Sequence, residues 1–158
     1  MTVYLDSSFV IRRLLGVGKP SAFWGKWEKA YASTLMRTEC ARIANNLRLD
    51  GPIDDAGRAR LGTWIETVCN AVTQVPLTDS VIKRASEAYP VAVGTLQALH
   101  LATMQELEAV HGVKCVLASD DEGLVQAAKA LGIAEATEKE KPTGPAKGKA
   151  EGETSKTE

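Results

Sequence analysis

The sequence lacks an excess of charge of either sign. It has 19 lysine and arginine residues against 20 aspartate and glutamate residues, a formal net charge of −1 and a pI of about 6.2. Proteins that bind nucleic acid regardless of sequence cover many phosphates with a basic surface. Any contact of this chain with nucleic acid is therefore expected to involve few phosphates or a bridging metal ion.

Cysteine is scarce, and long apolar runs are missing. Cys40, Cys69 and Cys115 are odd in number and widely spaced, without the spacing of metal ligands. We interpret them as reduced core residues of a cytoplasmic protein. No apolar run reaches the roughly 18 residues of a membrane-spanning helix, and Asp6 argues against a signal peptide. No membrane association is expected.

The chain has 158 residues, of which 44% are hydrophobic, and this suits one domain with its own core. From about residue 138 the sequence consists of lysine, glutamate and small residues, without one large apolar side chain. Such a segment buries too little surface to offset the entropy of ordering it. We predict one domain over residues 1–137 and a disordered charged tail over 138–158.

Strand-like and helix-like patterns alternate along the domain. Strands are predicted over 2–6, 72–77 and 114–118. Helices are predicted over about 7–15, 20–31, 33–49, 54–70, 79–89, 95–110 and 122–131. This alternation is typical of an α/β fold, in which helices cover the faces of a parallel sheet.

Two apolar runs end in acids and hydroxyls. Residues 3–5 lead into Asp6-Ser7-Ser8, and residues 115–118 lead into Ser119-Asp120-Asp121. Open α/β sheets place their sites at the carboxyl ends of buried parallel strands. The two acidic turns therefore indicate a cation-dependent active site.

Three polar residues stand on apolar helix faces. Glu39 shares a face with residues 35 and 43, and Gln97 shares one with residues 101 and 104. An inward carboxylate needs a cation or strong donors; the alternative for Glu39 is a surface side chain that pairs with a nearby arginine. His100 lies in an apolar run, either as a ligand or base or as a satisfied core histidine.

These segments resemble PIN-domain proteins, in particular the VapC-like toxin ribonucleases of type II toxin–antitoxin systems. The matching pieces are residues 3–8, 33–35 with Glu39, 94–102 and 116–121 with 124–132, in the family's order over nearly all of 1–136. The resemblance implies a three-layer α/β/α sandwich with a central, mainly parallel sheet. It also implies acids that bind Mg²⁺ or Mn²⁺ and cleave single-stranded RNA.

Carried over by position, the resemblance makes Asp6, Glu39 and Asp121 catalytic acids and metal ligands. Ser8, Ser119 and Asp120 become supporting residues, and Asp120 replaces Asp121 if the loop register shifts by one. The family has a catalytic aspartate where this chain has Gln97. Glutamine is neutral and offers one carbonyl oxygen, so we expect a weakened site in which a second ion suffers most.

Two functional hypotheses remain open. The first is a metal-dependent endoribonuclease, the toxin of a toxin–antitoxin pair, with activity reduced by Gln97. The second is a catalytically impaired PIN-like protein that acts by binding RNA or protein. A phosphatase of the haloacid dehalogenase type is set aside, because that chemistry needs an acid two residues after Asp6 and this chain has Ser8.

The expected partners are an RNA substrate, a cognate antitoxin and a second copy of the chain in a homodimer. Trp24 and Trp27, in an aromatic stripe at helical spacing, are either core residues or anchors for a partner. Arg12 and Arg42 are candidate contacts to phosphate or to an acidic partner, although scattered arginines are usually a solvated face.

Overall fold

The computed structural model describes residues 1–18 and 21–136, and the predicted tail over 138–158 lies outside the described residues. The strands are β1 Thr2–Leu5, β2 Lys29–Ser33, β3 Thr73–Val75 and β4 Val116–Ala118. The helices are α1 Ser7–Leu15, α2 Leu35–Leu49, α3 Asp55–Ala71, α4 Asp79–Ala85, α5 Thr95–His111 and α6 Glu122–Ala130.

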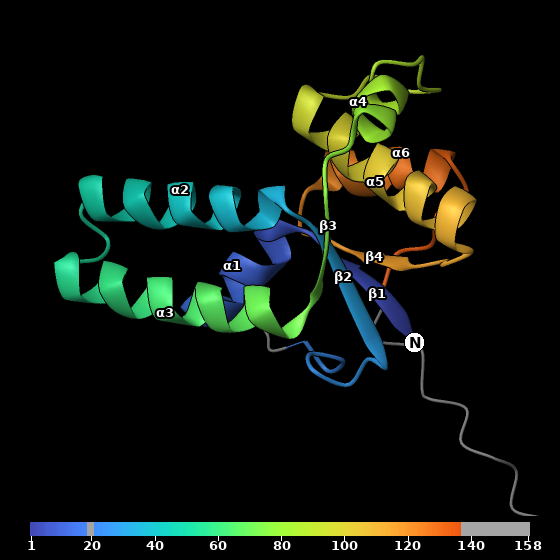
Figure 1. Ribbon diagram of the computed structural model, residues 1–158. Helices are drawn as coiled ribbons and strands as arrows, with labels where there is room; N and C mark the ends of the chain where they lie inside the picture. Colours follow the sequence, from blue (N-terminus) through green and yellow to red (C-terminus); the bar gives the residue numbers. More distant parts are fainter. Residues whose placement is uncertain (19–20, 137–158) are drawn as a thin grey trace, which may run out of the picture.

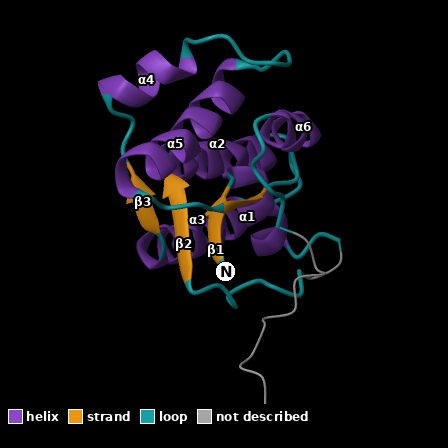
Figure 2. Ribbon diagram, turned by 90° about the vertical axis from the view of Figure 1, so that its right-hand side faces the viewer, coloured by secondary structure: helices purple, strands orange, loops and turns teal. Residues whose placement is uncertain are grey.

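The four described strands form one sheet in the order β3-β2-β1-β4, and every neighbouring pair is parallel. Figure 2 shows β3, β2 and β1 side by side in this order. The chain adds β2 and β3 on one side of β1, then returns to place β4 on its other side. The strand order therefore reverses between β1 and β4. In open α/β sheets the crevice outside such a reversal is where ligands bind.

The side chains of β1 alternate between two hydrophobic clusters. Val3 and Leu5 pack with α1, α2 and α3, whereas Tyr4 packs with α5 and α6. Figure 1 shows the sheet between these two helix groups, with α4 beside α5. The predicted three-layer α/β/α sandwich with a parallel sheet is confirmed.

The predicted helix over 20–31 is wrong. Residues 29–33 form β2, which pairs with β1 from Thr2↔Lys29 to Tyr4↔Tyr31, and no helix lies within the described residues 21–28. The aromatic spacing resembled a helical stripe because Phe23, Trp24 and Trp27 pack on the cluster of α1–α3 from an irregular segment. Tyr31 packs instead against the other cluster.

The cysteines carry free thiols in the structure. Cys40 and Cys69 belong to the core beside α1–α3, and burial raises the pKa of the Cys40 thiol to about 12. Cys115 is half-buried, and burial raises the pKa of its thiol to about 11. Across residues 1–18 and 21–136, none of the helices has both the length and the apolar character to cross a bilayer.

Candidate metal site

Asp6 lies at the carboxyl end of β1 and caps the N-terminus of α1. Its side chain is almost fully buried, and its oxygen Oδ2 accepts from the backbone N–H of Ser8 at 3.2 Å and from the hydroxyl of Ser119 at 2.9 Å. The hydroxyl of Ser8 also donates to Oδ2. These donors hold Oδ2, so the remaining oxygen, Oδ1, faces the interior of the site.

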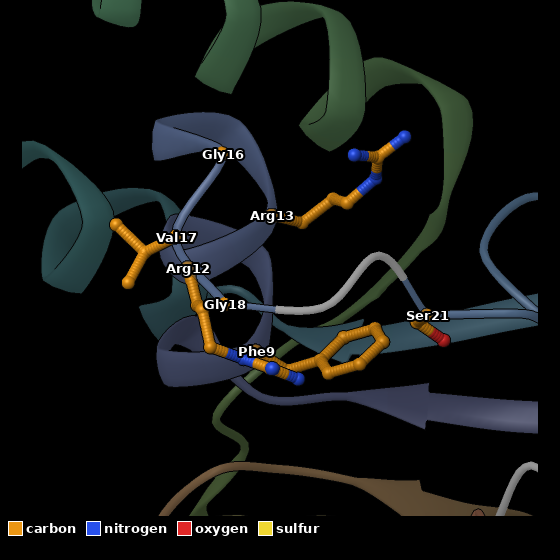
Figure 3. Close-up of a pocket in the computed structure, with 7 residues that line it drawn as sticks. All are labelled: Phe9, Arg12, Arg13, Gly16, Val17, Gly18 and Ser21. Atoms are coloured by element: carbon orange, nitrogen blue, oxygen red, sulfur yellow. The ribbon is translucent and has the colours of Figure 1, made fainter.

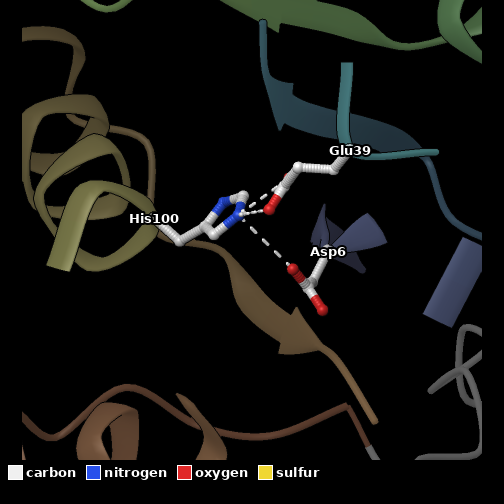
Figure 4. Close-up of side chains that lie close together, drawn as sticks. All are labelled: Asp6, Glu39 and His100. Carbon is white, nitrogen blue, oxygen red and sulfur yellow. Dashed lines mark hydrogen bonds and ion pairs between the residues drawn. The ribbon is translucent and has the colours of Figure 1, made fainter. Parts of the chain in front are cut away.

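Glu39 from α2 and His100 from α5 complete a cluster with Asp6 (Figure 4). The ring nitrogen Nε2 of His100 lies 3.1 Å from Oε2 of Glu39 and 3.5 Å from Oδ1 of Asp6. The His100 side chain is 2% exposed, and that of Glu39 is 14% exposed. Glu39 therefore faces inward, as its place on the helix predicts.

Tyr4 and the two acids contact opposite nitrogens of the His100 ring. Carboxylates only accept hydrogen bonds, so Nε2 of His100, which faces Asp6 and Glu39, must be protonated. The hydroxyl of Tyr4 lies 3.0 Å from Nδ1 and donates to it in the neutral ring, whereas in the protonated ring Nδ1–H donates to the oxygen of Tyr4. Burial, reinforced by the charges of Asp6 and Glu39, raises the pKa of Tyr4 far above its usual value. The phenol therefore keeps its proton.

The charges around His100 favour its protonated form. Burial by itself lowers the pKa of the ring, but the hydrogen bond with Glu39 and the negative charges of Asp6, Glu39 and Asp121 outweigh burial. The pKa of His100 is therefore raised above its ordinary value. In the protein without a metal ion, His100 is a satisfied buried histidine whose partners are the acids of the site.

Gln97 and Asp121 form a second polar group beside this cluster. Nε2 of Gln97 donates to both carboxylate oxygens of Asp121, at 3.0 Å each, and its Oε1 accepts from the backbone N–H of Gly94 at 2.9 Å. Asp121 also caps α6 by accepting from the N–H of Leu124 at 3.0 Å. The oxygens of Asp121 are therefore already bonded within the protein.

A metal ion fits one of these two groups. Asp6, Glu39 and His100 each offer a ligand atom, and these atoms lie within 4.8 Å of one another. Among the described residues Asp121 is outside this group, and because Nε2 of His100 bonds the acids as N–H, Asp6 and Glu39 are the members that could bind an ion without loss of that proton. Two carboxylates suffice for Mg²⁺, which keeps several waters.

The predicted supporting residues come together in the loop after β4. Ser119 Oγ accepts from the N–H of Asp121 at 3.0 Å, and Ser8 Oγ accepts from the N–H of Asp120 at 2.9 Å. The side chain of Asp120 pairs with Arg12 at the surface. The loop register thus places Asp121 toward α5 and Asp120 toward α1.

The predicted contact residues lie apart from the cluster. Trp24 and Trp27 are half-buried with ring centroids 5.5 Å apart, and Arg42 is exposed on α2. Arg12 stands over the ring of Phe9 and lines a cavity of about 120 Å³ with Arg13 and Ser21 (Figure 3). Their contact with RNA or a partner stays a prediction.

Comparison with known proteins supports the fold. No family model matches the sequence, and no curated protein matches it. A chain in the solved structure of FitAB bound to an IR36 DNA fragment is similar, with a TM-score of 0.59 and 16% sequence identity. The match covers 87% of this chain and 95% of that chain. At this identity the likeness shows the fold alone, which is the PIN-like α/β/α sandwich.

Two residues of the site escape sequence analysis. Tyr4 reads as one more apolar strand residue, and 96 positions separate it from its partner His100. Gly123 sits so close to Gln97 that a Cβ atom on it would lie 2.7 Å from the Gln97 Nε2. A tyrosine within a buried strand is a weak signal, because its hydroxyl needs a partner when buried. Gly123 carries no such signal.

Proposed function

We propose that this protein is a divalent-cation-dependent endoribonuclease of PIN type. The observation that carries the proposal is the convergence of Asp6 from β1 and Glu39 from α2 on His100, at the carboxyl edge of a PIN-like sheet. Clustered carboxylates there provide the negative field that holds a divalent ion beside a polyanionic substrate. When bound, Mg²⁺ or Mn²⁺ supplies Lewis-acid chemistry toward a phosphodiester.

Within this site Asp6 and Glu39 are the ligands that we assign to the ion. Ser8 and Ser119 fix Oδ2 of Asp6, which leaves Oδ1 directed at the cluster. The Nε2–H of His100 holds Oδ1 and the Glu39 carboxylate at one place. Because the chain has already oriented these oxygens, less entropy is lost when an ion arrives.

The biological role that we propose is the toxin of a toxin–antitoxin pair. The resemblance of segments 3–8, 94–102 and 116–121 to VapC-like toxins supports it, together with the PIN-like fold. The similar chain belongs to a FitAB assembly bound to DNA, which supports association of this protein with a partner chain. A homodimer in the cytoplasm, with an antitoxin that covers the site, is part of the proposal.

A second candidate is a PIN-like protein that has lost cleavage and acts by binding RNA or protein. The observation that favours it is the bond between Gln97 and Asp121, which replaces an acidic pair of the family pattern with a neutral amide. Fewer carboxylates bind ions more weakly, while binding of RNA or a partner protein through other side chains would not require the ion. The two candidates thus share a fold and differ in turnover.

The deciding experiment is cleavage of a structured and an unstructured RNA by the purified protein in Mg²⁺, Mn²⁺ and EDTA. Asp6→Asn is the inactivating control, because it removes the charge of a proposed ligand and keeps the side-chain size. Gln97→Asp is run beside it to restore the family pattern.

Cleavage that both EDTA and Asp6→Asn reduce by at least about 100-fold would establish the nuclease. Silence of the parent with cleavage by Gln97→Asp would mark a preserved scaffold disabled at position 97, and binding assays with RNA and protein partners would follow. Cleavage that survives both EDTA and Asp6→Asn would contradict both candidates.

A further inference from the structure

We infer that Gln97 takes the place of a cation between α5 and the loop after β4, so that Asp121 is a structural anchor and not an ion ligand. The inference deepens the proposed function by naming which acids of the same site hold the ion. It rests on that function for the existence of an ion, but ion binding and stability test it without RNA cleavage.

The first argument is the number of bonds that Asp121 already makes. Both of its oxygens accept from Nε2 of Gln97 at 3.0 Å, and one also accepts from the N–H of Leu124 at 3.0 Å. An ion that took the place of Nε2 of Gln97 on Asp121 would leave the N–H groups of that amide without their partner. Asp121 is accordingly outside the group whose ligand atoms converge.

The second argument is that Gln97 is fixed at both ends of its amide. Its Oε1 accepts from the N–H of Gly94 at 2.9 Å, at the N-terminus of α5, while its Nε2 bonds Asp121. The side chain therefore satisfies a free backbone donor at the start of one helix and the capping residue of another. The amide of Gln97 therefore connects α5 to α6 through hydrogen bonds at both of its ends. A side chain that merely replaced a metal ligand would not need these bonds.

The third argument is the room reserved for this amide. Gly123 lies in the first turn of α6, and a Cβ atom there would lie 2.7 Å from Nε2 of Gln97 and 3.2 Å from Oδ1 of Asp121. No side chain other than hydrogen is accommodated there without movement of Gln97. The absence of a side chain at Gly123 thus permits the close approach of the Gln97 amide to the first turn of α6.

Gln97 differs from an aspartate at the same position in its charge. An aspartate at position 97, although one methylene shorter, would direct a carboxylate toward that of Asp121, and neighbouring like charges repel unless a cation lies between them. The amide of Gln97 offers partial positive charge to Asp121 without an ion. The same contact between α5 and the β4 loop is thereby made independent of metal.

The first test measures Mn²⁺ binding by calorimetry to the full-length protein and to three variants. Asp121→Asn keeps an oxygen that can accept from Leu124 and Gln97, so the capping role survives. Asp120→Asn is the matched control, because it removes the same charge from the same loop without touching the cluster. Asp6→Asn removes a proposed ligand.

We expect Asp6→Asn to weaken Mn²⁺ binding by about tenfold or more. Asp121→Asn should stay within about threefold of Asp120→Asn, because both remove only a neighbouring charge. A larger loss in Asp121→Asn than in Asp120→Asn would identify Asp121 as a ligand and overturn the inference.

The second test compares the thermal stability of the parent and of Gln97→Asp in EDTA and in Mn²⁺. We expect Gln97→Asp to lose about 3 °C or more in Tm in EDTA and to recover most of it in Mn²⁺, since an ion then replaces the amide. Equal Tm values of parent and variant in EDTA would overturn the inference. This arm also decides the question if the parent binds no Mn²⁺, an outcome that would defeat the proposed function alone.

Discussion

Asp6 and Glu39 on the one hand and Asp121 on the other lie at the same edge of the sheet, and the protein stabilises their carboxylates in different ways. Asp6 and Glu39 converge on a histidine whose pKa is raised by their charge. Asp121 is bonded instead to the neutral amide of Gln97. The first group contains a titratable histidine, whereas Asp121 is held by hydrogen bonds to a neutral amide.

An acid that matches a sequence motif therefore does not always belong to the group whose possible metal-ligand atoms converge. Carboxylates from three separate segments reach the same region, yet the convergent group contains Asp6 and Glu39 without Asp121. What separates them is a side chain on the opposite helix: a histidine one turn along α5 in the first case and a glutamine in the second. The side chains of α5 therefore determine which acids from the other elements come together and which are held apart.

Removal of the His100 side chain should cause the largest loss of unfolding free energy. His100→Leu leaves Asp6 and Glu39 buried without their common donor, and breaking such a buried pair costs about 3 kcal/mol of unfolding free energy. Urea denaturation in EDTA measures the loss. His100→Gln, which keeps an N–H donor, should fall between the parent and His100→Leu. Parental stability of His100→Leu would show that the two acids need no partner.

The pH dependence of stability should come from the histidine group. The folded-state pKa of His100 lies above its unfolded value of 6.5. Its protonation therefore contributes stability that is complete below pH 6.5 and is lost as the pH rises through the folded-state pKa. In EDTA the unfolding free energy of the parent should decline over that range. His100→Gln should show a flatter profile, and identical profiles would contradict the assignment.

Tyr4→Phe tests how much the hydrogen bond between Tyr4 and His100 contributes to stability. The variant removes the hydroxyl that bonds Nδ1 of His100 and leaves this nitrogen buried without that partner, which costs about 1 kcal/mol or more. The phenylalanine ring preserves the packing between β1 and α5. Chemical denaturation measures the cost, and Tyr31→Phe on β2, whose side chain is half-buried, serves as the control. Equal effects of both variants would contradict the role of Tyr4.

The smallest effect is expected at the surface of the same loop. Asp120 pairs with Arg12, and both side chains are about one third exposed. Exposed ion pairs contribute little, so Asp120→Asn should change the unfolding free energy by no more than about 0.5 kcal/mol. RNA cleavage should also stay near the parental rate. A large loss of cleavage would place Asp120 in the site in place of Asp121.

Most of the fold follows from the sequence, because the helices have long periodic patterns with polar ends. The segment 20–31 is the exception. Its aromatic residues sit at helical spacing, but Ala30, Ala32 and Ser33 are buried within the sheet, and short strands with small residues give little periodic signal. The missed strand β2 lies between β1 and β3. A local pattern does not reveal such an insertion.

The sequence indicates where some polar side chains lie but not which of them pair, and the roles assigned to Asp6, Glu39 and Asp121 stay predictions. The inward position of Glu39 follows from helical spacing, and the acidic turns after β1 and β4 follow from the ends of apolar runs. The pairing of Tyr4 with His100 and of Gln97 with Asp121 depends on how α5 is rotated against the sheet. That rotation results from packing among distant segments, which spacing along one chain does not encode.

The position of β1 in the sheet has a consequence for synthesis on the ribosome. β1 is the first strand to be made, yet it lies between β2 and β4, and β4 is the last of the described strands. Until β4 emerges, β1 has an open edge and Asp6 lacks Ser119, its donor from the far end of the domain. A nascent chain that already contains Asp6, Glu39 and His100 thus still lacks β4 and the hydrogen bond from Ser119 to Asp6. Translation itself delays assembly of the site until the domain is nearly complete.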